Sequence, residues 1–163
     1  MKKSLRTGFT LIEMMAVVAV IAILATLALP SIQGRIVRGQ IVEAMRLTEI
    51  AKAPIAAAWA TTRALPADNA AADLPAADRI VGDYVSSVVV EAGAIHVTFG
   101  NRANAAIKGR RLSLRPAVVE DAPIVPVAWV CGHAAAVDKM TAKGTDRTDV
   151  ADNYLPLNCR APV

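Results

Sequence analysis

The feature that most constrains this chain is an apolar run near its N-terminus. Residues 9–33 are 25 consecutive positions whose only charged side chain is Glu13. As a helix this run would be about 37 Å long, enough to cross the ~30 Å hydrocarbon core of a bilayer. Lys2, Lys3 and Arg6 precede it, and a basic flank favours the cytoplasmic side of a membrane. The sequence therefore predicts a single membrane-spanning helix that starts in the cytoplasm.

Three interpretations of this run compete: a secretory signal peptide cut near residues 26–28, a plain membrane anchor, and an anchor cut at its front edge. The run is longer than the 7–15 apolar residues of a secretory signal. A carboxylate at mid-membrane costs about 2.5–3.5 kcal/mol, and neither export nor anchoring requires one. Cleavage between Gly8 and Phe9 would place a new amine one helical turn before Glu13. That amine can neutralise Glu13 within one chain or between neighbouring copies, and the physics alone leaves both open.

Beyond residue 33 the pattern becomes amphipathic and extends the predicted helix to about residue 62. Apolar or small side chains recur at spacings of three and four, as on a helix that packs on one face. They are Val37, Ile41, Ala44, Thr48, Ala51, Ile55, Ala58 and Thr62. Pro30 and Pro54 lie within this helix, and we expect each to kink or locally break it, because proline lacks an amide donor and clashes one turn back.

Residues 63–163 predict a small β-rich head. Residues 63–79 are rich in Ala, Asp and Pro and indicate a loop. Four antiparallel strands are predicted, two in a hairpin within 84–101 that turns at Glu91, Ala92 and Gly93, one at 111–115 and one at 123–131. Pro126 limits the start of the last strand to an edge or irregular position. The predicted fold class is α+β, with a long N-terminal α-helix packed on a four-stranded antiparallel sheet.

Cys131 and Cys159 are the only cysteines in the chain. If the apolar helix holds the head outside the cytoplasm, the compartment is oxidising and we expect a disulfide between them. Such a bond would stabilise the fold by about 3–4 kcal/mol in the chain-entropy model. The pair lacks C-x-x-C spacing, and with His96 and His133 it also lacks the ligand spacing of a zinc site.

No motif for catalysis or cofactor binding occurs in the sequence. A P-loop, G-x-S-x-G and H-E-x-x-H are all missing, so we expect neither an enzyme nor a cofactor. Asp146, Asp149 and Asp152 resemble a calcium loop only loosely and indicate a solvated acidic loop.

At the front of the apolar run the chain resembles the type IV pilin family. Residues 8–13, Gly-Phe-Thr-Leu-Ile-Glu, match the family's prepilin cleavage motif without departure, and the eight-residue leader followed by Phe9 resembles the type IVa subclass. The resemblance implies that a prepilin peptidase removes residues 1–8 and that Phe9 is N-methylated. It also implies that Glu13 pairs with the Phe9 amine of a neighbouring copy during assembly.

The head resembles type IVa major pilins as well. Residues 129–132 and 154–160 resemble the two ends of the family's disulfide-bounded loop, and residues 80–116 resemble its sheet. The resemblance implies a homo-oligomeric helical filament whose subunit is first a single-pass inner-membrane protein and then extracellular, in the pilus (fimbrium). Its implied partners are the prepilin peptidase and the inner-membrane pilus assembly machinery. Its implied roles are twitching motility, cell adhesion and DNA uptake.

Two other roles share the N-terminal motif. A minor pilin would prime or cap the filament and bind DNA or a surface, whereas a pseudopilin of type II secretion usually lacks the terminal disulfide loop. Lys108, Arg110 and Arg111 form the densest basic cluster, and we interpret it as a solvated turn because DNA contacts use more cations and stacking aromatics. A filament nevertheless repeats a weak patch many times, so DNA binding stays open.

Overall fold

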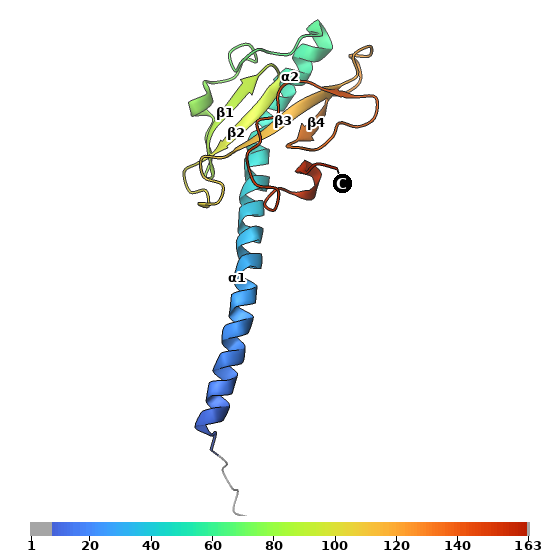
Figure 1. The fold of residues 1–163 in the computed structure, drawn as a ribbon. Coiled ribbons are helices and arrows are strands. Elements are labelled where there is room, and N and C mark those ends of the chain that lie inside the picture. Colours follow the sequence, from blue (N-terminus) through green and yellow to red (C-terminus); the bar gives the residue numbers. More distant parts are fainter. Residues whose placement is uncertain (1–7, 163) are drawn as a thin grey trace, which may run out of the picture. The chain divides into compact units, whose positions relative to one another are not determined.

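The computed structural model describes residues 8–162, and within residues 28–31 it describes the backbone alone. Its contacts divide the chain into two compact units, Met1–Arg35 and Ile36–Val163. The described part of the first unit contains only helix and the short segment before it, whereas the second unit contains helix, sheet and long connecting segments (Figure 1).

The predicted long helix is present as two helices. Helix α1 spans Leu11–Leu47 and α2 spans Glu49–Thr62. The backbone of α1 stays helical through Pro30, and α2 contains Pro54 without interruption. The helix therefore breaks at neither of the prolines that were predicted to kink or break it.

The interruption between the two helices lies at Thr48. Its amide donates to the carbonyl of Met45 at 3.2 Å, and its hydroxyl donates to the same oxygen at 2.6 Å. Threonine hydroxyls compete for backbone carbonyls in this way and disturb helices. Thr48 is fully buried, so the neighbouring layer holds this tightened turn in place. The sequence pattern counted Thr48 as a core position but gave no sign of its bond to Met45.

The sheet has the predicted antiparallel hairpin, the two other predicted strands and one short additional strand. The strands are β1 (Val85–Glu91), β2 (Ala94–Phe99), β3 (Arg111–Val118), β4 (Ala128–Cys131) and the two-residue β5 (Thr141–Ala142). Hydrogen-bonded strands follow the order β1-β2-β3-β4, and β5 pairs with the C-terminal end of β3. The α+β class and the four main strands are thus confirmed, while β5 was not predicted.

Two prolines set the limits of the later strands. Strand β3 continues past its predicted end through Pro116, which pairs with Trp129 of β4 and accepts a hydrogen bond from the Lys143 amide at 2.8 Å. Strand β4 begins only at Ala128, after Pro126. A proline is tolerated where the partner strand does not need its missing amide, and here the carbonyl of Pro116 still takes part in pairing.

The tight turn between β1 and β2 depends on a glycine. Ala92 and Gly93 both have positive φ, at 49° and 79°, as expected in a two-residue hairpin loop that follows strand twist. A Cβ atom on Gly93 would lie 2.8 Å from the side chain of Leu65. Glycine is therefore required at position 93 for two reasons: its positive φ and the close approach of the Leu65 side chain.

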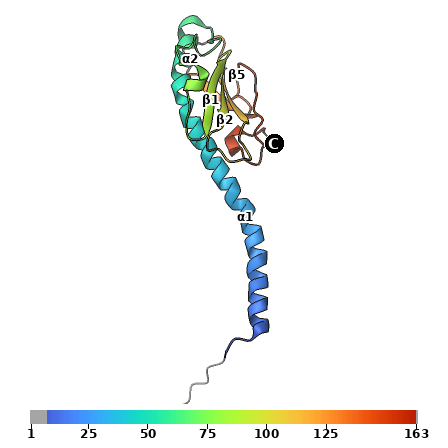
Figure 2. The ribbon, with the colours of Figure 1, turned by 90° about the vertical axis from the view of Figure 1, so that its left-hand side faces the viewer.

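The core of the second unit lies between the helices and one face of the sheet. The predicted helix positions from Val37 to Ile55 are buried there, together with Trp59. They pack against the sheet residues Val88, Val90, Val97, Phe99, Leu112 and Leu114. The opposite face of the sheet is covered by the segment that follows β4, as the side view in Figure 2 and the hydrogen bonds of residues 147 and 148 with Ser113 show. The sheet is therefore covered on both faces, which explains why β2 is almost wholly buried rather than alternating.

A polar network holds this outer layer to the sheet. The His96 ring is buried, and its Nδ1 lies 2.9 Å from the Ser113 hydroxyl oxygen. The same oxygen accepts a hydrogen bond from the Arg147 amide at 2.8 Å, and the Ser113 amide donates to the Thr148 hydroxyl at 3.0 Å. Burial, reinforced by the charge of Arg147, lowers the pKa of His96 below its ordinary value of 6.5. Histidine is therefore neutral in this layer.

This buried histidine predicts a loss of stability in mild acid. The unfolded chain takes up a proton on His96 below about pH 6.5, whereas the folded chain resists it, so the free energy of unfolding falls as pH drops from 7 through 6.5. The fall should end once the pH passes below the lowered pKa of the folded state. Urea unfolding of the detergent-solubilised chain, followed by tryptophan fluorescence, measures this slope. His96→Gln, which cannot titrate, should flatten it between pH 7 and 5, and an unchanged slope would contradict the assignment.

Candidate assembly interface

The helix of the first unit is apolar on all sides and has no cover from its own unit. Every described side chain from residue 8 to residue 27 is exposed, including Phe9 at 77%. Among the described residues, α1 is the one helix long and apolar enough to cross a membrane. Soluble monomers do not leave such a continuous apolar surface in water. Lipid or other protein chains must therefore cover it.

Small residues leave shallow depressions in this apolar surface. One depression is lined by Leu11, Met14, Met15, Val18, Ala19 and Ala22, and a second by Ala16, Val17, Val20 and Ile21. In helix–helix contacts within membranes, small residues let the backbones approach and larger ones fill the spaces between them. Such depressions can accept side chains of another helix.

Glu13 is held by the residue at the start of the helix. Because α1 begins at Leu11, Thr10 occupies the N-cap position and Glu13 the third position of the helix. The Glu13 carboxylate accepts hydrogen bonds from the Thr10 amide at 3.0 Å and the Thr10 hydroxyl at 2.8 Å, and the Glu13 amide lies 3.3 Å from that hydroxyl. This reciprocal arrangement is a capping box. The sequence analysis did not predict this capping box, although the T-x-x-E spacing of Thr10 and Glu13 is its sequence signal.

The predicted cleavage position lies just before this cap. Gly8 and Phe9 are exposed and outside the helix. A Cβ atom on Gly8 would meet no atom of the described chain within 4 Å. The basic residues Lys2, Lys3 and Arg6 of the leader lie outside the described residues. The peptide bond between Gly8 and Phe9 is therefore sterically open. Cleavage of this bond and methylation of Phe9 stay predictions at this point.

The predicted disulfide is present. Cys131, at the end of β4, is bonded to Cys159 in the short 3₁₀ helix Leu157–Cys159, with the two Cα atoms 4.5 Å apart. The bond is buried, and the His133 amide donates to the Cys159 carbonyl at 3.0 Å. Gly132 between them has φ 53°, and a Cβ atom there would lie 2.6 Å from the Cys159 oxygen. Only glycine fits this crossing point.

His133 also ties the terminal segment to the loop that covers the sheet. Its Nδ1 lies 2.9 Å from a carboxylate oxygen of Asp146, and its Nε2 lies 3.8 Å from Asp152. Burial of Asp146 is outweighed by hydrogen bonds from the hydroxyl and amide of Thr148 and from His133, which together hold the pKa of this carboxyl below its ordinary value.

Two of the three aspartates of the predicted acidic loop, Asp146 and Asp152, thus share His133 as a partner, whereas Asp149 accepts a hydrogen bond from the Arg111 amide. Among the described residues, no group of three or more histidines, cysteines, aspartates or glutamates is arranged to hold a metal ion.

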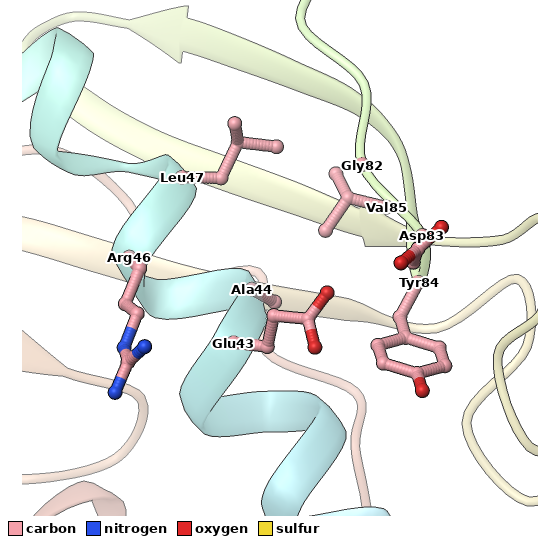
Figure 3. A pocket seen from close by; sticks show the side chains of 8 residues that line it. All are labelled: Glu43, Ala44, Arg46, Leu47, Gly82, Asp83, Tyr84 and Val85. Atoms are coloured by element: carbon pink, nitrogen blue, oxygen red, sulfur yellow. The ribbon is translucent and has the colours of Figure 1, made fainter.

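A pocket that no sequence pattern indicated lies between α1 and the start of β1 (Figure 3). Its volume is about 270 Å³, and it is lined by Glu43, Ala44, Arg46, Leu47 and residues 82–85. Figure 3 shows the carboxylates of Glu43 and Asp83 and the ring of Tyr84 on one side, with Arg46 extending away from them. Asp83 is already paired with Arg102 at 3.5 Å. The lining of the pocket contains no serine, threonine, cysteine, lysine or histidine.

Comparison with known proteins matches both parts of the chain. The family model "Pilin (bacterial filament)" matches residues 37–160, and the model "Prokaryotic N-terminal methylation motif" matches residues 3–29. The type IV major pilin protein PilE of Neisseria gonorrhoeae is 36% identical over 163 residues, covering 96% of this chain and 95% of that protein. A fimbrial protein of Neisseria meningitidis serogroup B is 34% identical, with the same coverage. Fimbrial protein EcpC of Eikenella corrodens is 34% identical over 98% of this chain and 94% of its own length.

Loss of the disulfide should weaken the head without changing the apolar helix. Cys131→Ser is expected to lower the free energy of unfolding by about 3–4 kcal/mol, because the unfolded chain regains the freedom of the closed loop. Urea unfolding of the detergent-solubilised chain measures this loss. The double variant Cys131→Ser/Cys159→Ser should lose the same amount, since only one bond is removed. Equal unfolding midpoints for the variant and the parent protein would show that the bond contributes nothing.

Proposed function

This chain belongs to the type IV pilin family and is a structural, non-enzymatic subunit of a pilus, and from this premise we propose that it is the major subunit of a helical filament. The observation that carries the proposal is the apolar run of residues 9–33, whose only charge is Glu13 and whose side chains are all exposed from Phe9 to Leu27. The relatives named major pilins match almost the whole chain rather than the N-terminal motif alone, which supports the major over the minor role.

The subunit begins as a single-pass inner-membrane precursor. The prepilin peptidase cuts between Gly8 and Phe9 and methylates the new amine, and the inner-membrane assembly machinery then takes the subunit into the filament outside the cell. The match to the methylation motif supports this order, as does the exposed position of both residues before the helix. The finished filament serves twitching motility, cell adhesion and DNA uptake.

Assembly transfers the apolar helix from lipid to a core made of the same segment from other copies. Both environments are apolar, so this transfer adds little hydrophobic stabilisation, and close helix packing contributes instead. The Thr10 cap satisfies Glu13 in part, but hydrogen bonds from a neutral residue leave the carboxylate charge uncompensated. The Phe9 amine of a neighbouring copy supplies the opposite charge. Glu13 therefore selects the axial position at which a new subunit stops.

The cap and the charge of Glu13 can be separated by two variants. Glu13→Gln keeps a side chain that suits the capping box but removes the charge. We expect it to be processed and inserted normally, but to dock about tenfold more weakly at each step, which is a loss of about 1.4 kcal/mol per step, and therefore to yield clearly fewer sheared filaments. Thr10→Ala removes the cap, at about 1 kcal/mol of helix stability, and should still build filaments. Normal filament yield from Glu13→Gln would restrict this residue to capping.

The abundance and the N-terminus of the subunit test its role. Quantitative mass spectrometry of sheared filaments should find this chain as the main component, and its first peptide should begin with N-methyl-Phe9. A trace amount would instead indicate a minor pilin that primes or caps the filament. A terminus near residue 29 would indicate a conventional exported protein that has lost its anchor.

A further inference from the structure

The head contains a long stretch of sequence without any acidic residue. Between Glu91 and Glu120 there are five cations and no Asp or Glu. Arg115 is half-buried on β3, where it donates to the carbonyls of Gly132 and Ala134. The other four cations, Arg102, Lys108, Arg110 and Arg111, are exposed in or beside the connection between β2 and β3. We refer to residues 100–111 as the basic loop.

Few carboxylates neutralise the basic loop. Asp83 lies 3.5 Å from Arg102, and both side chains are well exposed. Asp149 accepts a hydrogen bond from the backbone of Arg111, and Glu43 is exposed on the adjacent part of α1.

Within residues 8–162, Lys108 and Arg110 have no carboxylate at ion-pair distance, and the Lys108 ammonium donates only to the Asn101 carbonyl, at 3.2 Å. The loop therefore keeps a surplus of positive charge.

The basic loop is fixed to α1 at a residue that follows the apolar run closely in the sequence. The Asn104 amide donates to the side-chain oxygen of Gln40 at 2.9 Å, and Gln40 is buried at this contact. Gln40 follows residue 33, the last residue of the apolar run, by only seven positions along the chain. Arg35 and Arg38 are exposed on the same stretch of α1. The headgroup layer of a bilayer is about 5–8 Å thick, and charges act over about 8–10 Å in physiological salt.

We propose that the basic loop binds anionic phospholipid headgroups while the subunit is still inserted in the membrane. This inference rests on the proposed function, because it requires α1 to span a bilayer. Cations next to a membrane span are attracted to anionic lipid, with each one strengthening binding about fivefold. Nucleic acid is the less favoured ligand, because residues 100–111 contain no aromatic side chain on which bases stack. Assembly would then have to release the loop from the lipid surface.

The test uses the full mature chain inserted in vesicles, with a fluorophore on Ala105→Cys in the basic loop. Quenchers attached to lipid headgroups are present at equal density in phosphatidylcholine vesicles and in vesicles that also contain phosphatidylglycerol. We expect stronger quenching in the anionic vesicles, and about 0.5 M salt should remove the difference, because screening shortens the range of the attraction. The same label on Ala60→Cys in α2 should be quenched equally in both kinds of vesicle.

Matched charge variants identify the surface responsible. Lys108→Gln/Arg110→Gln should weaken the docked state about 25-fold, from two lost cations at about fivefold each. Arg63→Gln/Lys139→Gln removes two other exposed cations and should leave the quenching unchanged. An equal effect of the two double variants would mean that net charge alone acts, and would overturn the proposal.

Two further outcomes would also overturn the proposal. The first is equal quenching in both kinds of vesicle. If the chain also resists carbonate extraction, it still spans the membrane, and the proposed function is not contradicted. The second is a loss of duplex DNA binding in Lys108→Gln/Arg110→Gln with unchanged lipid quenching, which would assign the basic loop to nucleic acid. A chain that carbonate extracts from the vesicles would instead contradict the proposed function itself, and the docking with it.

Discussion

The whole structure depends on an apolar helix that its own unit does not cover and that carries one carboxylate. Lipid and neighbouring helices are almost equally good environments for its Leu, Ile, Val and Met side chains. Apolar burial therefore lets the segment move between membrane and filament but does not decide where it stops. In the proposed assembly Glu13 determines where the segment stops, since an unpaired carboxylate in an apolar environment is costly. Under this proposal a single charge supplies the axial register that the uniform apolar surface lacks.

The head is built in a contrasting way, with every layer tied to the next. The helices cover one face of the sheet, and the segment after β4 covers the other, where the Arg147 amide donates to the Ser113 hydroxyl and the Ser113 amide donates to Thr148. The buried disulfide fixes the end of the chain to β4. A head stabilised within one chain can fold before assembly, so only the apolar helix needs other copies. This division suits a subunit that exists first singly and then in a filament.

Sequence reasoning predicted the features that follow from periodic or paired residues. The buried helix face from Val37 to Ile55, the hairpin at Gly93 and the disulfide were all predictable, because spacing and residue type determine them. The break at Thr48 was not, since it arises from a side-chain bond to Met45 rather than from a proline. Strand β5 and the burial of both sheet faces depend on residues 132–150, whose sequence has no periodic pattern. The pocket at Tyr84 needs two distant segments to meet, which no local pattern encodes.

The measurement that tests the central claim most directly is a high-resolution electron cryomicroscopy structure of sheared filaments. The account predicts that each Glu13 carboxylate lies within hydrogen-bonding distance, about 3 Å, of the methylated Phe9 amine of a neighbouring subunit. It also predicts that the apolar part of α1 is covered by equivalent segments. A Glu13 bonded only to Thr10 and to its own terminus, with the amines of neighbouring copies elsewhere, would contradict the claim that this charge sets the register.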